Sequence, residues 1–126
     1  MTDTVNKHEM RVVALKRSGH HAIIQWMYAN VGGGYLFLNQ CRPGVNPFDL
    51  KHISKKPERR FISNIEGITP EQSCAGQHVP KSALIYNYEH HCLEEIAAPI
   101  PDPIRQKWVG VSARRTDILA LRDPFN

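Results

Sequence analysis

Short apolar runs separated by polar, Gly- and Pro-rich segments dominate the pattern of the chain. Residues 11–15 (RVVAL) are apolar at every position after the first, which is typical of a strand inside a parallel sheet. Between residues 22 and 31 the apolar positions recur at helical spacing, and three glycines from Gly32 onward end this predicted helix. Further apolar runs predict strands at residues 35–38, 60–65, 83–88 and 118–121.

Strands that alternate with helices or long connections indicate an α/β fold with a mainly parallel sheet and flanking helices. A second, shorter helix is predicted through Leu93, Ile96 and Ala97, and the prolines of API-PDP interrupt regular structure after it. Residues 1–9 are polar and are expected to form a flexible N-terminus, which leaves residues 10–126 as a single domain. The last strand runs directly into RDPFN, so we interpret the chain as a fragment or natural truncation of a larger domain.

Composition narrows the class of protein. The chain has 126 residues, 41% hydrophobic and 22% charged, which is typical of one ordered domain. No apolar run is long enough to span a membrane and the N-terminus lacks a signal-peptide core, so we predict a cytoplasmic protein without a membrane partner. Three cysteines without a CxxC pair argue against a disulfide framework. A net charge of +4 favours an anionic partner without identifying it.

The loop KRSGHH, between the first strand and the first helix, carries the main candidate chemistry. Free N–H groups and the helix dipole favour phosphate or sulfate at a helix N-terminus. Arg17 can bind oxyanions bidentately, Ser18 offers a hydroxyl group and Gly19 allows close backbone approach. His20 and His21 add ring donors. The Walker A pattern GxxxxGK[ST] does not occur in this loop, which disfavours an ordinary ATPase.

Two segments resemble the sulfotransferase family, which uses 3′-phosphoadenosine 5′-phosphosulfate (PAPS) as co-substrate. KRSGHHAIIQW resembles the 5′-phosphosulfate-binding loop, and its Ser-Gly-His-His form is similar to a bacterial branch of the family. ILALRDPFN resembles the start of the second signature, which continues to a serine beyond this chain. The resemblance spans the N-terminal portion of that domain and implies a P-loop NTPase-like core without a metal. It implies that the 3′-phosphate is bound by Arg122. The residues that it implies for binding the 5′-phosphosulfate are Arg17, Ser18, Gly19, His20 and His21.

The same residues allow plainer interpretations. Ser18 could be a helix N-cap, Arg17 a solvated strand end and the two histidines surface residues. Arg122 could form a salt bridge at the end of its strand. A truncated, non-catalytic module that binds a nucleotide or another anion is therefore the alternative function.

If the family assignment holds, sulfuryl transfer resembles phosphoryl transfer, with in-line displacement through a loose transition state. Arg17 is then the cation that contacts the transferred group. The acceptor, a hydroxyl or amine of a small molecule or glycan, requires a general base. Glu89 is the first candidate because it follows the strand at residues 83–88, and ligands of α/β sheets bind at such strand ends. His78 is the second candidate, and His90 and His91 are the third.

A rival hypothesis uses soft ligands. Cys74 and His78, together with His90, His91 and Cys92, could share a zinc ion in a small metal-stabilised binding domain. The basic run KHISKKPERR is interpreted as a solvated loop, and no nucleic-acid partner is predicted. An exposed edge on the fifth predicted strand would favour a homo-oligomer.

Overall fold

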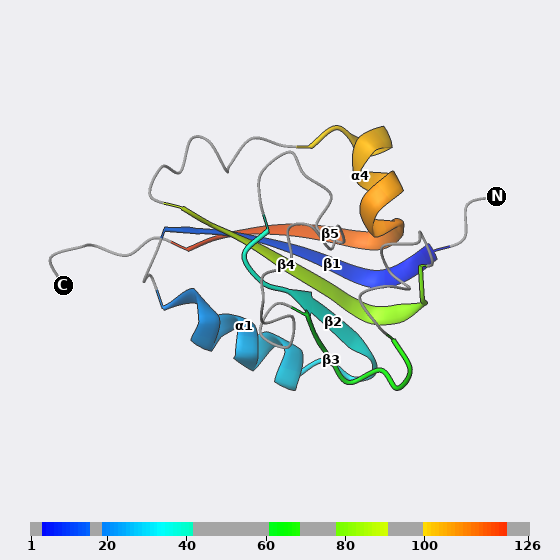
Figure 1. Cartoon of the computed structure of the whole chain (residues 1–126), viewed down its shortest axis with the longest axis horizontal. Coiled ribbons are helices and arrows are strands. Elements are labelled where there is room, and N and C mark those ends of the chain that lie inside the picture. The colour runs from blue at the N-terminus through cyan, green and yellow to red at the C-terminus, as the bar shows by residue number, and fades with distance from the viewer. Residues whose placement is uncertain (1–3, 16–18, 42–60, 69–77, 91–99, 121–126) are drawn as a thin grey trace, which may run out of the picture.

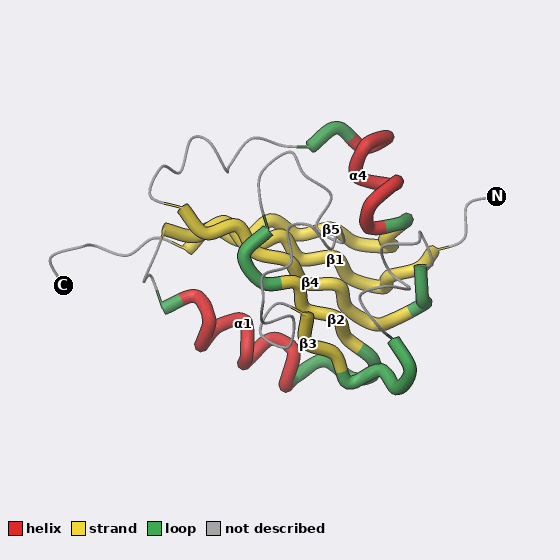
Figure 2. Tube along the Cα trace, viewed as in Figure 1, coloured by secondary structure: helices red, strands yellow, loops and turns green. Residues whose placement is uncertain are grey.

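The computed structural model describes residues 4–15, 19–41, 61–68, 78–90 and 100–120 of the chain. Within these residues the chain forms five strands and two helices (Figure 2). In chain order they are β1 (Thr4–Leu15), α1 (His20–Ala29), β2 (Tyr35–Leu38), β3 (Phe61–Ser63), β4 (Lys81–His90), α4 (Asp102–Val109) and β5 (Val111–Ala120).

The strands form one sheet with the order β3-β2-β4-β1-β5 (Figure 1). Strand β1 lies between β4 and β5 and is parallel to both, and β2 is parallel to β4. The short β3 pairs with β2 in the antiparallel direction. The predicted α/β class with a mainly parallel sheet is therefore confirmed.

Two apolar clusters show that the helices cover opposite faces of the sheet. Val12 of β1 and Ile85 of β4 pack with Ile24 of α1. Their neighbours in sequence, Val13 and Leu84, belong to a second cluster with Val109 of α4. Because successive side chains of a strand point to opposite faces, α1 and α4 lie on opposite sides of the sheet, as Figure 1 also shows.

Helix α1 confirms the predicted helix and ends where the sequence suggested. Asn30 caps its C-terminus, and the Asn30 side chain donates a hydrogen bond to the Trp26 carbonyl oxygen at 2.8 Å, just before the glycines. Ile24 is 1% exposed, whereas the neighbouring Ile23 and Trp26 are 47% and 67% exposed. Contact with the sheet therefore depends on a narrow stripe of the helix.

Strand β1 begins at Thr4, so residues 4–9 are not the flexible segment that their polarity predicted. Asn6 and Glu9 are fully buried in this half of the strand. The Asn6 amide donates hydrogen bonds to the Val109 carbonyl oxygen at 2.8 Å and to the Ser112 hydroxyl at 3.1 Å. These two bonds occupy the Asn6 side-chain donor, which offsets much of the cost of burying it, whereas Asn6 Oδ1 has no hydrogen-bond partner among the described residues.

Helix α4 and the first part of β5 were also not predicted. The PDP sequence that was expected to interrupt structure instead begins α4, where proline in the first turn loses no intrahelical hydrogen bond. Gly110, with φ of 78°, ends the helix, and β5 starts at Val111 rather than at residue 118. The predicted helix through residues 93–97 lies outside the described residues.

Candidate functional site

The carboxyl ends of β1 and β4 meet at one edge of the sheet. Their register pairs Ala14 with Glu89 and Leu15 with His90. Ala14 also pairs with Ala120, which brings the end of β5 to the same edge. Three sequence segments that carry candidate residues therefore arrive side by side.

This edge also has the topology of a ligand-binding crevice. Strand β1 is followed by α1 on one face of the sheet and β4 by α4 on the other, although β1 and β4 are neighbours (Figure 1). Adjacent strands whose connections leave toward opposite faces create a crevice outside their carboxyl ends, where α/β proteins bind ligands. The crevice position expected here lies between Leu15 and His90.

Helix α1 begins beside this crevice with features that suit an anion. Its N-cap is Gly19 in the left-handed conformation, with no side-chain capping bond, and its first turn carries no acidic residue. The His20 ring is buried and lies 4.2 Å, centroid to centroid, from the exposed His21 ring. Because helix N-termini carry partial positive charge, this end favours a negatively charged group.

Gly19 has φ of 80°, and a Cβ atom placed on it would meet nothing within 4 Å. Gly19→Ala should therefore lower the free energy of unfolding by about 1–2 kcal/mol through backbone strain alone. Gly32→Ala is the matched control, because Gly32 is equally open but lies outside the left-handed region. Urea unfolding measures both variants, and equal losses would contradict the left-handed start of α1.

The described residues include part of the sequence-predicted site. Gly19, His20 and His21 form the start of α1, and Glu89 is placed by register at the carboxyl end of β4. Arg17, Ser18 and Arg122 lie outside the described residues. By sequence position, Arg17 falls between β1 and α1, and Arg122 follows β5 by two residues.

His78 is placed at the opposite end of the sheet from Glu89. A Cβ atom on Gly110 would lie 3.4 Å from the His78 ring and 3.3 Å from the Val5 side chain, both near the amino ends of the strands. Strand β4 separates this end from His90 by nine residue steps, or about 30 Å. The structure therefore does not bring His78 together with the start of α1.

The distance between the two ends of β4 also argues against the zinc site proposed from the sequence. His78 precedes β4 and His90 ends it, so these two proposed ligands lie at opposite ends of one extended strand. Bonds from zinc to histidine nitrogen are about 2.0–2.1 Å long, which is incompatible with this spacing. Cys74, His91 and Cys92 lie outside the described residues.

Asn87 is a residue near the carboxyl edge that sequence reasoning missed. It is fully buried on β4, and its side-chain oxygen accepts a hydrogen bond from the Gln40 backbone N–H group at 2.5 Å. Its backbone oxygen accepts another from the Cys41 amide at 2.8 Å, which holds the segment after β2 against β4. Among the described residues, Asn87 Nδ2 has no hydrogen-bond partner. An amide within the apolar run ALIYNY was the available signal.

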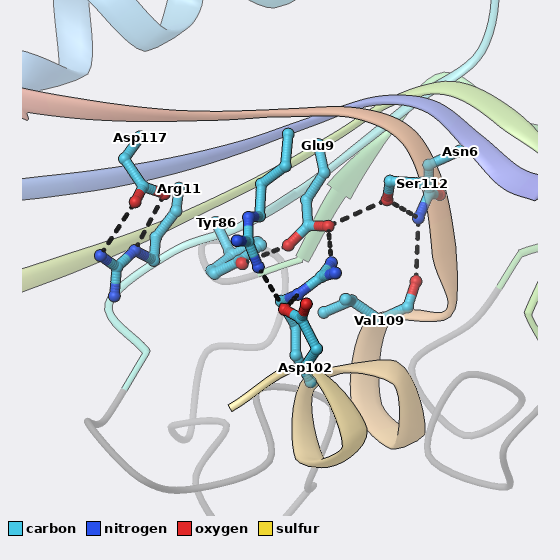
Figure 3. A network of polar contacts seen from close by, with 10 residues as sticks. Asn6, Glu9, Arg11, Tyr86, Asp102, Val109, Ser112 and Asp117 are labelled. Atoms are coloured by element: carbon cyan, nitrogen blue, oxygen red, sulfur yellow. Dashed lines mark hydrogen bonds and ion pairs between the residues drawn. The ribbon is translucent and has the colours of Figure 1, made fainter. Parts of the chain in front are cut away.

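A second group of polar contacts lies between α4 and the sheet (Figure 3). The buried Glu9 carboxylate accepts hydrogen bonds from the Tyr86 hydroxyl at 2.5 Å and the Ser112 hydroxyl at 2.9 Å, and pairs with Arg105. Burial and the neighbouring Glu9 charge raise the pKa of Tyr86 well above its ordinary value, so Tyr86 stays a hydrogen-bond donor. These contacts satisfy the carboxylate and fasten α4 to the sheet.

The described part of the chain thus defines an α/β protein with a mainly parallel five-stranded sheet and a crevice position at the carboxyl ends of β1 and β4. Comparisons with protein-family models, with curated proteins and with solved structures found no match. Neither of the two described helices has the length and apolar character needed to cross a membrane.

Proposed function

We propose that the protein binds PAPS at the carboxyl edge of the sheet and transfers its sulfuryl group to a hydroxyl or amine acceptor. One observation carries this proposal: α1, which has no acidic residue in its first turn, follows β1 on one face of the sheet, while the neighbouring β4 is followed by α4 on the other. The coincidence of this topology with the KRSGHH sequence supports an anion site more strongly than either feature does alone.

Residue roles follow the resemblance to sulfotransferases. Arg17, Ser18 and Gly19, together with the first N–H groups of α1, hold the 5′-phosphosulfate in a P-loop-like core. His20 and His21 adjoin the same position at the start of the helix. Arg122 holds the 3′-phosphate, which is supported by its sequence position after β5, the strand that flanks β1 on its other side. Asn87 Nδ2 offers a further buried donor near this edge.

In the proposed reaction, the acceptor oxygen or nitrogen attacks the sulfur atom while the bond from sulfur to the 5′-phosphate oxygen breaks. Charge develops on the leaving nucleotide, where Arg17 and the α1 N–H groups stabilise it. Glu89 takes the acceptor proton as general base, because its register position adjoins the end of β1. His78 has no part in this mechanism, since it lies at the other end of the sheet.

Thermal unfolding with adenosine 3′,5′-bisphosphate, the nucleotide product, tests the proposed cofactor site. A ligand at a hundred times its Kd stabilises the folded state by about 2.7 kcal/mol, so the midpoint should rise clearly. Adenosine 5′-monophosphate should give a smaller rise because it lacks the 3′-phosphate. Arg17→Ala and Arg122→Ala should each reduce the rise with the bisphosphate.

Arg114→Ala is the matched control, because Arg114 is an exposed arginine in the middle of β5. It should leave the rise with the bisphosphate unchanged. A midpoint indifferent to the bisphosphate would refute the site. Labelled PAPS and a panel of alcohols, phenols, amines and glycans test for sulfuryl transfer. If the bisphosphate binds but no acceptor is sulfated, the result would favour the non-catalytic anion-binding module. If transfer is observed, Glu89→Gln should lower its rate by about 10²–10⁴.

A further inference from the structure

A pocket lies at the amino ends of the strands, far from the carboxyl edge. Its volume is about 520 Å³, and its lining includes Lys7 of β1, Lys81 and Ser82 of β4, Gly34 and Ile65. This volume is within the usual range for small-molecule sites. Lys81 begins β4, whereas Glu89 lies near its end, so the two sites are separate.

The two lysines of this pocket have different environments. Lys81 is 8% exposed, and its amine donates a hydrogen bond to the Val79 carbonyl oxygen at 3.0 Å. Burial lowers the pKa of Lys81 from 10.5 to about 8, so about a tenth of the amine is neutral at pH 7. Lys7, in contrast, is exposed on the neighbouring strand.

The charge of Lys81 also acts on His78, which lies in the segment before β4. The pKa of His78 is lowered, first by burial and second by the charge of Lys81. Two basic side chains, from β4 and from the segment before it, thus approach each other at this end of the sheet. Lys7 adds a third from β1.

We propose that this pocket binds small aldehydes that carry an anionic group, with Lys81 as the nucleophile and Lys7 as the partner of the anion. The lone pair of the neutral Lys81 amine attacks the carbonyl carbon, and a proton passes from the attacking nitrogen to the carbonyl oxygen. The resulting carbinolamine loses water and leaves a Schiff base, so no oxidant or reductant takes part. This site lies beyond the proposed sulfuryl transfer and does not depend on it.

Pyridoxal 5′-phosphate, followed by borohydride reduction and peptide mass spectrometry, provides the test. Lys107 is an exposed lysine of α4 and serves as the internal reference. At pH 7 a pKa near 8 raises the neutral fraction more than a hundredfold over an ordinary lysine, while the lower basicity offsets part of that gain. We therefore expect Lys81 to be labelled about tenfold faster than Lys107.

The pH profile provides a second readout. Labelling of Lys81 should rise with pH and level off about one unit above its pKa of about 8, because nearly all of the amine is then neutral. Labelling of an ordinary lysine should continue to rise toward pH 10. A Lys81 profile that rises throughout this range, or labelling no faster than that of Lys107, would overturn the proposal.

Two variants separate the roles of the lysines. Lys81→Arg keeps the charge and should abolish labelling at this position without lowering the unfolding midpoint by more than a few degrees. Lys7→Gln should reduce the preference for pyridoxal 5′-phosphate over uncharged pyridoxal while leaving the slower reaction with pyridoxal unchanged. An equal rate with both aldehydes in the wild-type chain would refute the anion-binding role of Lys7.

Discussion

Arg105→Met should lower the free energy of unfolding by about 3–5 kcal/mol, because it leaves the buried Glu9 carboxylate without its cationic partner. The Glu9 side chain is fully buried, and the Arg105 side chain is 12% exposed. Hydrogen bonds from Tyr86 and Ser112 remain in the variant, but neither donor neutralises the charge. Urea unfolding followed by circular dichroism measures the loss.

Arg115→Met is the matched control for this prediction. Arg115 contacts Asp102 at 2.8 Å, but their side chains are 42% and 62% exposed. Solvent screens both charges of an exposed ion pair, so this variant should remain close to the wild type. The double variant Glu9→Gln with Arg105→Met should recover part of the loss, because no buried charge is then left unpaired. Equal losses in the two single arginine variants would contradict the buried pair of Glu9 and Arg105.

Ile24→Ala should cost about 2–5 kcal/mol, since it removes the one buried apolar side chain of α1. Ile24 packs against Val12 and Ile85 on the sheet. The variant should also weaken binding of adenosine 3′,5′-bisphosphate, because the start of α1 is then held less firmly beside the strand ends. Chemical unfolding and titration calorimetry measure the two effects.

Ile23→Ala provides the comparison, because Ile23 is the next residue along and is 47% exposed. Its loss of stability should stay below about 1 kcal/mol. If both variants lose the same amount, the helix contacts the sheet through a different face from that observed. If Ile24→Ala loses stability but keeps full affinity, the anion site does not depend on the position of α1.

The apolar elements of this fold could be predicted from the sequence, and the polar ones could not. The strand Tyr35–Leu38 was predicted with its observed bounds, because a short apolar run between turn residues is typical of a buried strand. The first half of β1 was missed because Asn6 and Glu9 are typical of solvent-exposed segments. They are buried because Val109, Ser112, Arg105 and Tyr86 supply their partners. No local pattern reveals a partner about a hundred residues away.

Some residues of the candidate sites could likewise be predicted from the local sequence, and others could not. The link from KRSGHH to a helix N-terminus is local, and α1 begins at His20 as that sequence suggested. The position of Glu89 followed from the general rule for strand ends, and the register agrees with it. His78 was the second candidate for the general base, but the sequence around it carries no information on which end of the sheet it occupies. Lys81 was missed because its chemistry depends on burial, which the sequence around it does not show.

The position of β1 in the sheet has a consequence for how the chain acquires its structure. Both strands that flank β1 lie far along the sequence, with Asn6 paired to Lys81 on one side and to Ser112 on the other. At translation rates of about 5–20 residues per second, the synthesis of β5 is completed roughly 5–20 s after that of β1. Such distant pairings also slow the folding reaction itself. During that interval the apolar half of β1 has no complete set of neighbours, so efficient folding in the cell should depend on chaperones that protect the nascent chain.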